Sequence, residues 1–103
     1  YDDDMRLAVE AVAVFGGGLA VAAGGELRAL LPLPIAGLMS DRPFEEVAAG
    51  LARAEAAASA LGCAVPSPFM VLSFLALSVI PKLRLTDRGL LDVEAWRLVP
   101  LRA

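Results

Sequence analysis

Histidine, asparagine and glutamine are absent from this sequence, and cysteine, threonine, tyrosine and tryptophan occur once each. Without histidine, the chain lacks both the commonest general base and the commonest zinc ligand of proteins. The single cysteine, Cys63, allows no internal disulfide and no paired-cysteine metal site. A lone thiol is typical of a reducing compartment, so we expect a cytoplasmic protein.

Charge is also scarce. Charged residues make up 20% of the chain, the net charge is −3, and the few basic residues are scattered along the sequence. Because nucleic-acid binding needs a basic face, we expect no nucleic-acid partner. Hydrophobic residues reach 58%, above the roughly 45–50% of ordinary domains. This excess excludes disorder as a description of the whole chain, and it has to be covered by self-association or by a partner.

The segment Ala64–Pro81 is the natural candidate for a membrane span, since it carries no charge. It falls short of the roughly 20 residues that a spanning helix needs, and it contains three prolines. We therefore expect a buried protein segment and no membrane association. The acidic opening Asp2–Asp4 is also unlike the basic start of a signal peptide, so none is expected.

The first predicted helix runs over Met5–Phe15, where apolar residues recur at helical spacing after the acidic Asp2–Asp4. Acidic residues suit the positive end of a helix dipole. Gly16–Gly18 follows. A triple glycine invites comparison with a phosphate-binding loop, but it comes after a helix and no Lys-Ser/Thr pair follows it. We interpret it as a helix stop.

Two apolar runs, Leu19–Ala23 and Glu26–Leu31, flank the pair Gly24-Gly25. Two glycines at this position predict a two-residue β-hairpin turn. The predicted register pairs Ala23 with Glu26, Val21 with Arg28 and Leu19 with Leu30 on one face, and Ala22 with Leu27 and Ala20 with Ala29 on the other. The second set, extended by Leu31, carries no charge, so we expect it to face helices.

The second predicted helix starts near Ser40, Asp41 and Pro43, and Gly62 stops it. Its predicted apolar stripe comprises Phe44, Val47, Ala48, Leu51, Ala54, Ala58 and Leu61. A short buried helix follows from Pro68 to about Leu77, with Ser67 as its N-cap, although a strand is the competing interpretation of such an apolar run.

The C-terminal part is predicted as a loop over Lys82–Asp92, with turns at Asp87 and Gly89, and a final strand over Val93–Leu101 that ends near Pro100. The order α-β-β-α-α-β predicts an α+β fold: a small antiparallel sheet, made of the hairpin and the C-terminal strand, packed with about three helices. We expect residues 1–103 to form a single domain.

The remaining acid–base candidates are carboxylates, and each cluster has a structural interpretation. Asp2–Asp4 and Glu45-Glu46 lie at helix starts, and Asp87 and Asp92 bracket a turn. Neither Ser67 nor Ser73 has a neighbouring histidine or lysine to activate it, and Cys63 is interpreted as an ordinary thiol. The residues alone therefore predict no catalytic and no metal site in this chain.

Two motifs indicate a family. The segment Leu31–Asp41 (LPLPIAGLMSD) resembles a signature of the C-terminal part of bacterial adenine deaminases. The segment Pro66–Leu77 (PSPFMVLSFLAL), continuing into Val79–Pro81, resembles a second one. The Met5–Val9 helix start and the Asp92-Val93 pair fit the same family pattern, so the resemblance covers essentially the whole chain.

The resemblance implies a parent enzyme of the amidohydrolase superfamily that converts adenine and water to hypoxanthine and ammonia. A divalent metal (Mn, Fe or Zn) would activate the water. The family holds this metal with histidines and acidic residues of a preceding (β/α)8 barrel, and no position here matches those motifs. The resemblance therefore implies that residues 1–103 are a C-terminal accessory domain without the barrel, with no cofactor of its own. Its expected partners are that barrel and further copies in a homo-oligomer.

The alternatives are a free-standing module that self-associates without enzymatic activity and, third, a peripheral membrane module. The residues expected to line a pocket or an interface are apolar or small and lie in or near the two motifs: Ile35, Gly37, Leu38, Met39, Ser40, Phe69 and Met70. Large apolar side chains in a loop are unusual and suit the flat wall of a purine pocket. The plain alternative is a strand end followed by a helix cap.

Overall fold

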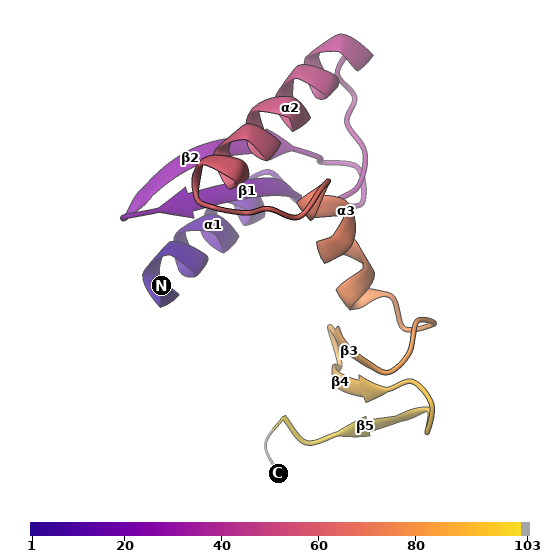
Figure 1. Ribbon diagram of the computed structural model, residues 1–103. Coiled ribbons are helices and arrows are strands. Elements are labelled where there is room, and N and C mark those ends of the chain that lie inside the picture. Colours follow the sequence, from indigo (N-terminus) through magenta and orange to yellow (C-terminus); the bar gives the residue numbers. More distant parts are fainter. Residues whose placement is uncertain (102–103) are drawn as a thin grey trace. The chain divides into compact units, whose positions relative to one another are not determined.

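The computed structural model describes residues 1–101 (Figure 1). Its elements are, in order, α1 (Asp2–Val14), β1 (Gly18–Ala23), β2 (Glu26–Pro32), α2 (Phe44–Ala60), α3 (Pro68–Ser73), a 3-10 turn (Phe74–Ala76), β3 (Leu83–Thr86), β4 (Gly89–Asp92) and β5 (Arg97–Val99). The α+β class and the antiparallel strand pairing are confirmed. The chain divides into two compact units, Tyr1–Pro66 and Ser67–Ala103.

Helix α1 ends as its glycines predict. Phe15 is the C-cap and Gly16 follows with φ 73°, the left-handed conformation that glycine adopts without strain. The Gly16 N–H donates to the Ala13 carbonyl and the Gly17 N–H to the Val12 carbonyl, both at 3.1 Å. These two bonds form a Schellman motif, which satisfies carbonyls left open at the helix end. The interpretation of Gly16–Gly18 as a helix stop is confirmed.

The hairpin turn is also as predicted, with positive φ at both Gly24 (64°) and Gly25 (75°). The two pairs nearest the turn are confirmed: Ala23 with Glu26 and Ala22 with Leu27. Beyond them the predicted register is wrong, because Arg28 forms a bulge and Val21 pairs with Ala29. The extra residue moves Leu31 onto the face of Val21.

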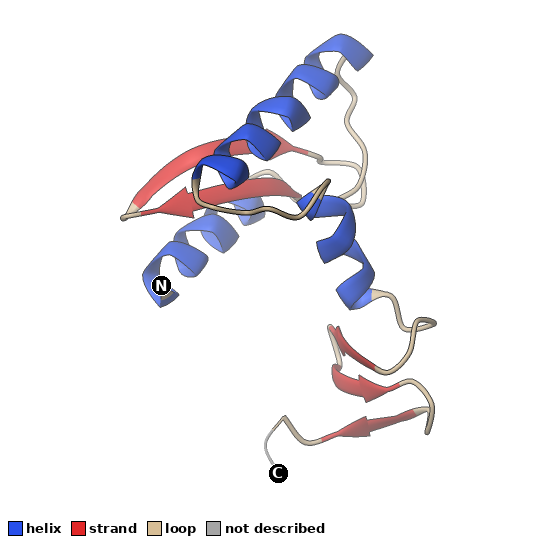
Figure 2. Cartoon of the chain, viewed as in Figure 1, coloured by secondary structure: helices blue, strands red, loops and turns tan. Residues whose placement is uncertain are grey.

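Helices cover both faces of this two-stranded sheet, with α1 on one side and α2 on the other (Figure 2). The buried hydrophobic side chains among the described residues are few, and all belong to this first unit: Val21, Leu31, Leu33 and Ala54. A methyl group added at Gly50 of α2 would lie 2.7 Å from Leu31 Cδ1. In this core the backbone of α2 at Gly50 therefore packs closely against the Leu31 side chain.

The apolar stripe predicted for α2 is partly wrong. Its sheet side uses the small residues Gly50 and Ala54, which are buried, whereas Phe44, Leu51 and Leu61 are exposed. Compared with the prediction, the helix is rotated about its axis, because the small residues let its backbone approach the hairpin closely. It begins at Phe44 with Pro43 as its N-cap, at the end of the predicted start over Ser40, Asp41 and Pro43.

In the second unit, α3 begins with Pro68 at its first position, as predicted, and the strand alternative for this segment is wrong. Ser67 occupies the N-cap position with φ 47° but makes no side-chain capping bond. The regular helix is shorter than predicted, since it passes into the 3-10 turn at Phe74.

The loop predicted over Lys82–Asp92 is wrong, because β3 and β4 pair there as a hairpin around Asp87 and Arg88. The Thr86 hydroxyl holds the turn, since it donates to the Gly89 carbonyl at 2.8 Å and accepts from the Arg88 N–H at 3.2 Å. The final strand, β5, is shorter than predicted and pairs with β4. These three strands form a sheet separate from the first hairpin, so the prediction that the hairpin and the C-terminal strand share one sheet is wrong.

Candidate functional site

The loop between β2 and α2 holds five of the predicted site residues, and all but Ser40 lie in one tight turn, Ile35–Met39. The Ile35 N–H donates to the Met39 carbonyl at 3.0 Å, and the N–H groups of Leu38 and Met39 both donate to the Ile35 carbonyl at 3.1 Å. The two residues at the tip, Ala36 (φ 55°) and Gly37 (φ 73°), both have positive φ. The turn therefore has one defined backbone shape.

This turn is anchored on the triple glycine. The Leu33 N–H donates to the Gly17 carbonyl at 3.0 Å. A side chain at Gly17 would collide with the Gly37 Cα, so the two backbones touch. Only glycine at position 17 permits such an approach. The triple glycine thus has a second role, because Gly17 supports the loop between β2 and α2.

The large side chains of the turn are exposed rather than packed against the rest of the first unit. Leu38 is 74% exposed and Met39 57%, and Ile35 is exposed as well. Ser40 is half-buried, and its hydroxyl accepts from the Arg42 N–H at 3.1 Å instead of capping α2. The turn is consequently a hydrogen-bonded platform that presents apolar side chains outward.

A hollow of about 660 Å³ lies behind the platform, between β2 and the start of α2. Its lining mixes apolar and charged residues: Phe15, Leu30, Leu31, Pro32, Pro34, Ser40, Asp41, Arg42, Pro43, Glu46, Val47 and Arg53. Of the predicted site residues, it contains only Ser40. The other two predicted residues, Phe69 (half-buried) and Met70 (exposed), lie on α3 in the second unit.

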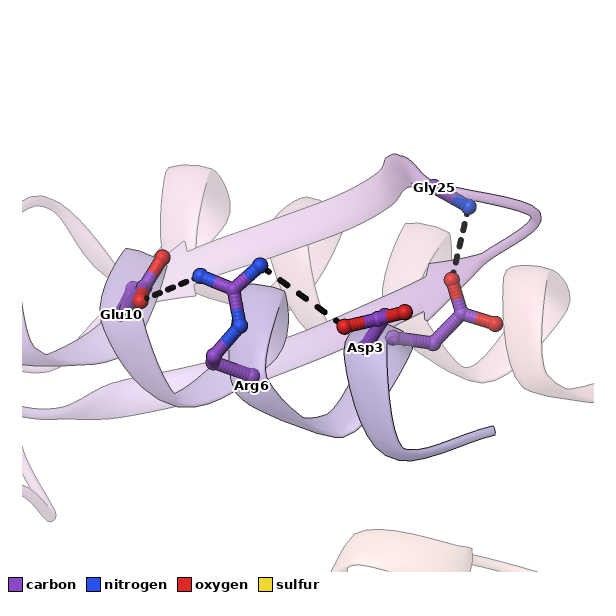
Figure 3. A network of polar contacts seen from close by, with 5 residues as sticks. Asp3, Arg6, Glu10 and Gly25 are labelled. Carbon is purple, nitrogen blue, oxygen red and sulfur yellow. Dashed lines mark hydrogen bonds and ion pairs between the residues drawn. The ribbon is translucent and has the colours of Figure 1, made fainter.

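The sequence analysis missed a polar contact between the start of α1 and the first hairpin. The Asp4 carboxylate accepts from the Gly25 N–H at 2.7 Å and from the Gly24 N–H at 3.2 Å. These bonds, that to Gly25 foremost, lower the pKa of Asp4 below its ordinary value. Sequence spacing could not predict this contact, because Asp4 lies about twenty residues before the glycines that it binds. Its neighbours Asp3, Arg6 and Glu10 form an ion-pair row along α1 (Figure 3).

The described residues do not fit a metal centre. Among residues 1–101, no three carboxylate or thiol side chains lie together where they could hold an ion. The divalent metal implied for the parent enzyme therefore has no candidate ligand set in this part of the chain. Within the same residues, no helix has both the length and the apolar character needed to cross a membrane.

Comparison with known families places the sequence. The model of the adenine deaminase C-terminal domain matches residues 1–97. The chain belongs to this family. The two motifs that carried the resemblance, Leu31–Asp41 and Pro66–Leu77, both lie inside the matched region.

Three relatives show how much of the enzyme the chain represents. It is 60% identical to an adenine deaminase of Deinococcus deserti, over 98% of this chain and 18% of that protein. It is 56% identical to one of Oleidesulfovibrio alaskensis, over 97% and 18%, and 54% identical to one of Moorella thermoacetica, over 97% and 17%. The chain thus spans less than a fifth of the length of these relatives.

In this member of the family, the second unit also presents many exposed hydrophobic side chains. None of its described hydrophobic side chains is buried. Exposed ones occur on α3, in the 3-10 turn, on β3 and β5 and in the segments that connect or follow these elements: Met70, Val71, Leu72, Phe74, Leu75, Leu77, Val79, Leu83, Leu85, Trp96, Leu98 and Leu101. Surfaces of this kind mark interaction sites rather than free solvent-facing protein.

Proposed function

We propose that this chain is the non-catalytic C-terminal domain of an adenine deaminase, which converts adenine and water to hypoxanthine and ammonia. Its role is to pack against the catalytic barrel of the same polypeptide and to contribute to an oligomer in the cytoplasm. The metal chemistry belongs to the barrel. The turn at Ile35–Met39 would face that barrel and shape the purine pocket or its lid.

One observation carries the proposal: the second unit has apolar side chains on its helix and its strands but no buried core among its described residues. Burying an exposed leucine against another protein surface contributes about 1.5–3 kcal/mol. A unit built in this way gains its stability from what covers it. The family match and the small share of the relatives' length make the rest of the same polypeptide the first candidate for that cover.

The test uses the full-length enzyme that contains this chain, with Leu72→Asn compared to Ser73→Asn. Leu72 is 56% exposed, and Ser73 is its exposed polar neighbour on α3. Leu72→Asn should lower the melting temperature, because it removes part of the about 1.5–3 kcal/mol that a buried leucine contributes, while kcat per folded enzyme stays unchanged. Ser73→Asn should have a smaller effect.

Equal melting temperatures for the two variants would contradict packing of α3. A fall in kcat without a fall in stability would place Leu72 at the chemistry instead. If the melting temperature of the Leu72→Asn enzyme depended steeply on protein concentration, the covering surface would be another subunit rather than the barrel.

A further inference from the structure

The three-stranded sheet of the second unit has two faces that differ in what lies on them. Residues directly opposite each other in an antiparallel sheet point their side chains to the same face. Leu90 pairs with Leu85 and with Val99, so these three side chains share one face. Leu91 pairs with Leu98, and these two side chains lie on the other face. The sheet can therefore pack through the Leu85 face while the Leu91 face stays accessible.

A hollow of about 430 Å³ lies on the Leu91 face. Leu91 and Leu98 supply its apolar surface. Arg88 lines it from the turn between β3 and β4, and Trp96 and Arg97 line it from the turn between β4 and β5. The two turns lie at opposite ends of the four-residue strand β4, about 13 Å apart. Small-molecule sites have volumes of about 300–1,000 Å³ and this mixture of apolar surface and few polar groups.

Trp96 occupies an unusual backbone conformation at one end of the hollow. Its φ is 50° and its side chain is 67% exposed. A bulky residue rarely adopts this left-handed conformation, whereas glycine does so without strain. The Asp92 carboxylate fixes the turn before Trp96, since it accepts the Ala95 N–H at 2.9 Å. An exposed indole at a position better suited to glycine contributes little to the chain's own packing, so it indicates a role in binding.

Two guanidinium groups give the hollow its charge. Arg88 and Arg97 are both exposed, and among residues 1–101 neither forms an ion pair. Asp87 also lines the hollow, so two arginines against one aspartate leave a formal charge of +1. The Thr86 hydroxyl holds the turn that carries Arg88. Guanidinium groups bind phosphate oxygens through paired, charge-assisted hydrogen bonds, so an anion suits this end of the hollow.

We propose that the hollow binds a nucleoside monophosphate, whose base stacks on Trp96 and whose phosphate pairs with Arg88. Such a ligand combines the two features that the hollow separates along β4, a flat aromatic ring and an anion. Aromatic side chains stack on any base, so the site selects nucleotides as a class. The inference goes beyond the proposed function, because it adds a ligand site in the C-terminal domain to the purine site of the enzyme.

The test is isothermal titration calorimetry of the full-length enzyme that contains this chain, with adenosine monophosphate (AMP) as the probe. The enzyme should bind AMP at least about tenfold more tightly than adenosine or inorganic phosphate, since each of these makes only half of the contacts. No binding of AMP would overturn the proposal, because the hollow would then be covered or unused. Adenosine that binds as tightly as AMP would also overturn it.

Two variants locate the bound nucleotide. Trp96→Gly removes the indole and relieves the backbone at φ 50°. It should weaken AMP binding about tenfold or more without lowering the melting temperature. Arg88→Ala should weaken AMP binding by about as much and make the affinity less dependent on salt. AMP binding unchanged in both variants would place the nucleotide elsewhere in the enzyme and overturn the proposal.

Lys82→Ala is the matched control for Arg88→Ala. Lys82 is an exposed basic residue of the same unit and does not line the hollow. Its loss should change AMP affinity by less than about twofold, because salt screens a distant surface charge. An equal effect of both variants would mean that net charge alone attracts the nucleotide, which would contradict a specific site.

A nucleic-acid strand is the other ligand that offers bases and phosphates together. A short single-stranded oligonucleotide that binds more tightly than AMP and competes with it would identify a strand as the ligand and overturn the proposal. An oligonucleotide that fails to compete supports the mononucleotide. All of these outcomes are independent of the Leu72→Asn experiment on α3, so a failure of the nucleotide site leaves the proposed function standing.

Discussion

At the scale of single residues, Asp4 joins two elements that are far apart in the chain. Its carboxylate accepts two N–H groups from the tight turn of the first hairpin, and the bonds favour the charged form. An N–H pair in such a turn has no partner in the hairpin itself, so the helix supplies one. This contact fixes the start of α1 at the tip of the sheet.

The pH dependence of stability should report this contact. Because the pKa of Asp4 is lower in the folded than in the unfolded chain, its stabilisation is fully present above the unfolded value of about 3.9 and is lost as the pH falls through the folded value. Asp4→Asn should therefore lower the melting temperature most above about pH 5. The difference from the natural sequence should shrink toward pH 3.

Asp3→Asn is the matched control for this experiment. Asp3 lies in the same helical turn and loses the same charge, but within residues 1–101 its carboxylate forms an ion pair with Arg6 alone, at 3.8 Å, and does not reach the hairpin turn. Its melting temperature should run nearly parallel to that of the natural sequence. The same pH profile in both variants would show that the helix dipole, not the hairpin contact, is responsible.

Ala36 is a second single-residue test, since it has φ 55° without being glycine. The left-handed conformation costs alanine about 1–2 kcal/mol, and a glycine would remove this strain. Part of the gain is lost because glycine is more flexible in the unfolded chain. Ala36→Gly should raise the free energy of unfolding by about 0.5–1 kcal/mol in urea denaturation. Gly37→Ala, at φ 73°, should lower it by about as much. A loss of stability in Ala36→Gly, or a gain in Gly37→Ala, would contradict the described turn.

At the scale of elements, strong local signals predicted the fold better than they predicted its surfaces. Glycines at positive φ end α1 and form the first hairpin turn, and Pro68 starts α3, all as expected. The bulge at Arg28 was not predictable, because pairing rules assume one residue opposite one. The β3–β4 hairpin was missed because its Asp87-Arg88 turn is not a glycine pair.

The exposure of the Ile35–Met39 loop could be predicted from the sequence, but the contacts that support the loop could not, and its role as a site stays a prediction. A loop of large apolar residues after Pro32 and Pro34 indicated an unusual surface, and the structure exposes those side chains. That Gly17 and Gly37 would touch could not be foreseen, since the contact joins distant segments. Likewise, the sequence could not show that α2 packs on the sheet through its small residues, because this depends on the contact of Gly50 with the distant Leu31.

The loop between β2 and α2 yields a prediction for the intact enzyme. Leu38→Ala and Met39→Ala remove side chains that contribute little to the chain's own core, because both are mostly exposed. If the loop shapes the purine pocket, each should raise KM or lower kcat several-fold without lowering the melting temperature. Unchanged kinetics together with a lower melting temperature would make the loop structural only. Ala36→Gly, at the tip of the same turn, is the control for altered backbone.

At the scale of the whole molecule, the chain has a small core around the first hairpin and no buried core among the described residues of its second unit. Much of its 58% hydrophobic content therefore lies on surfaces that we expect another part of the protein to bury. In the proposed enzyme the barrel provides that cover and holds the metal. The C-terminal domain supplies the packing surface and the Ile35–Met39 turn.

The most direct test of this account measures ammonia release from adenine by three samples prepared with added Mn²⁺, Fe²⁺ or Zn²⁺. They are this chain alone, the rest of the enzyme alone, and the two expressed together as separate polypeptides. The account predicts that the chain alone matches buffer and that its presence raises the activity of the rest of the enzyme. Turnover by the chain alone, or an activity of the remainder that the chain leaves unchanged, would contradict it.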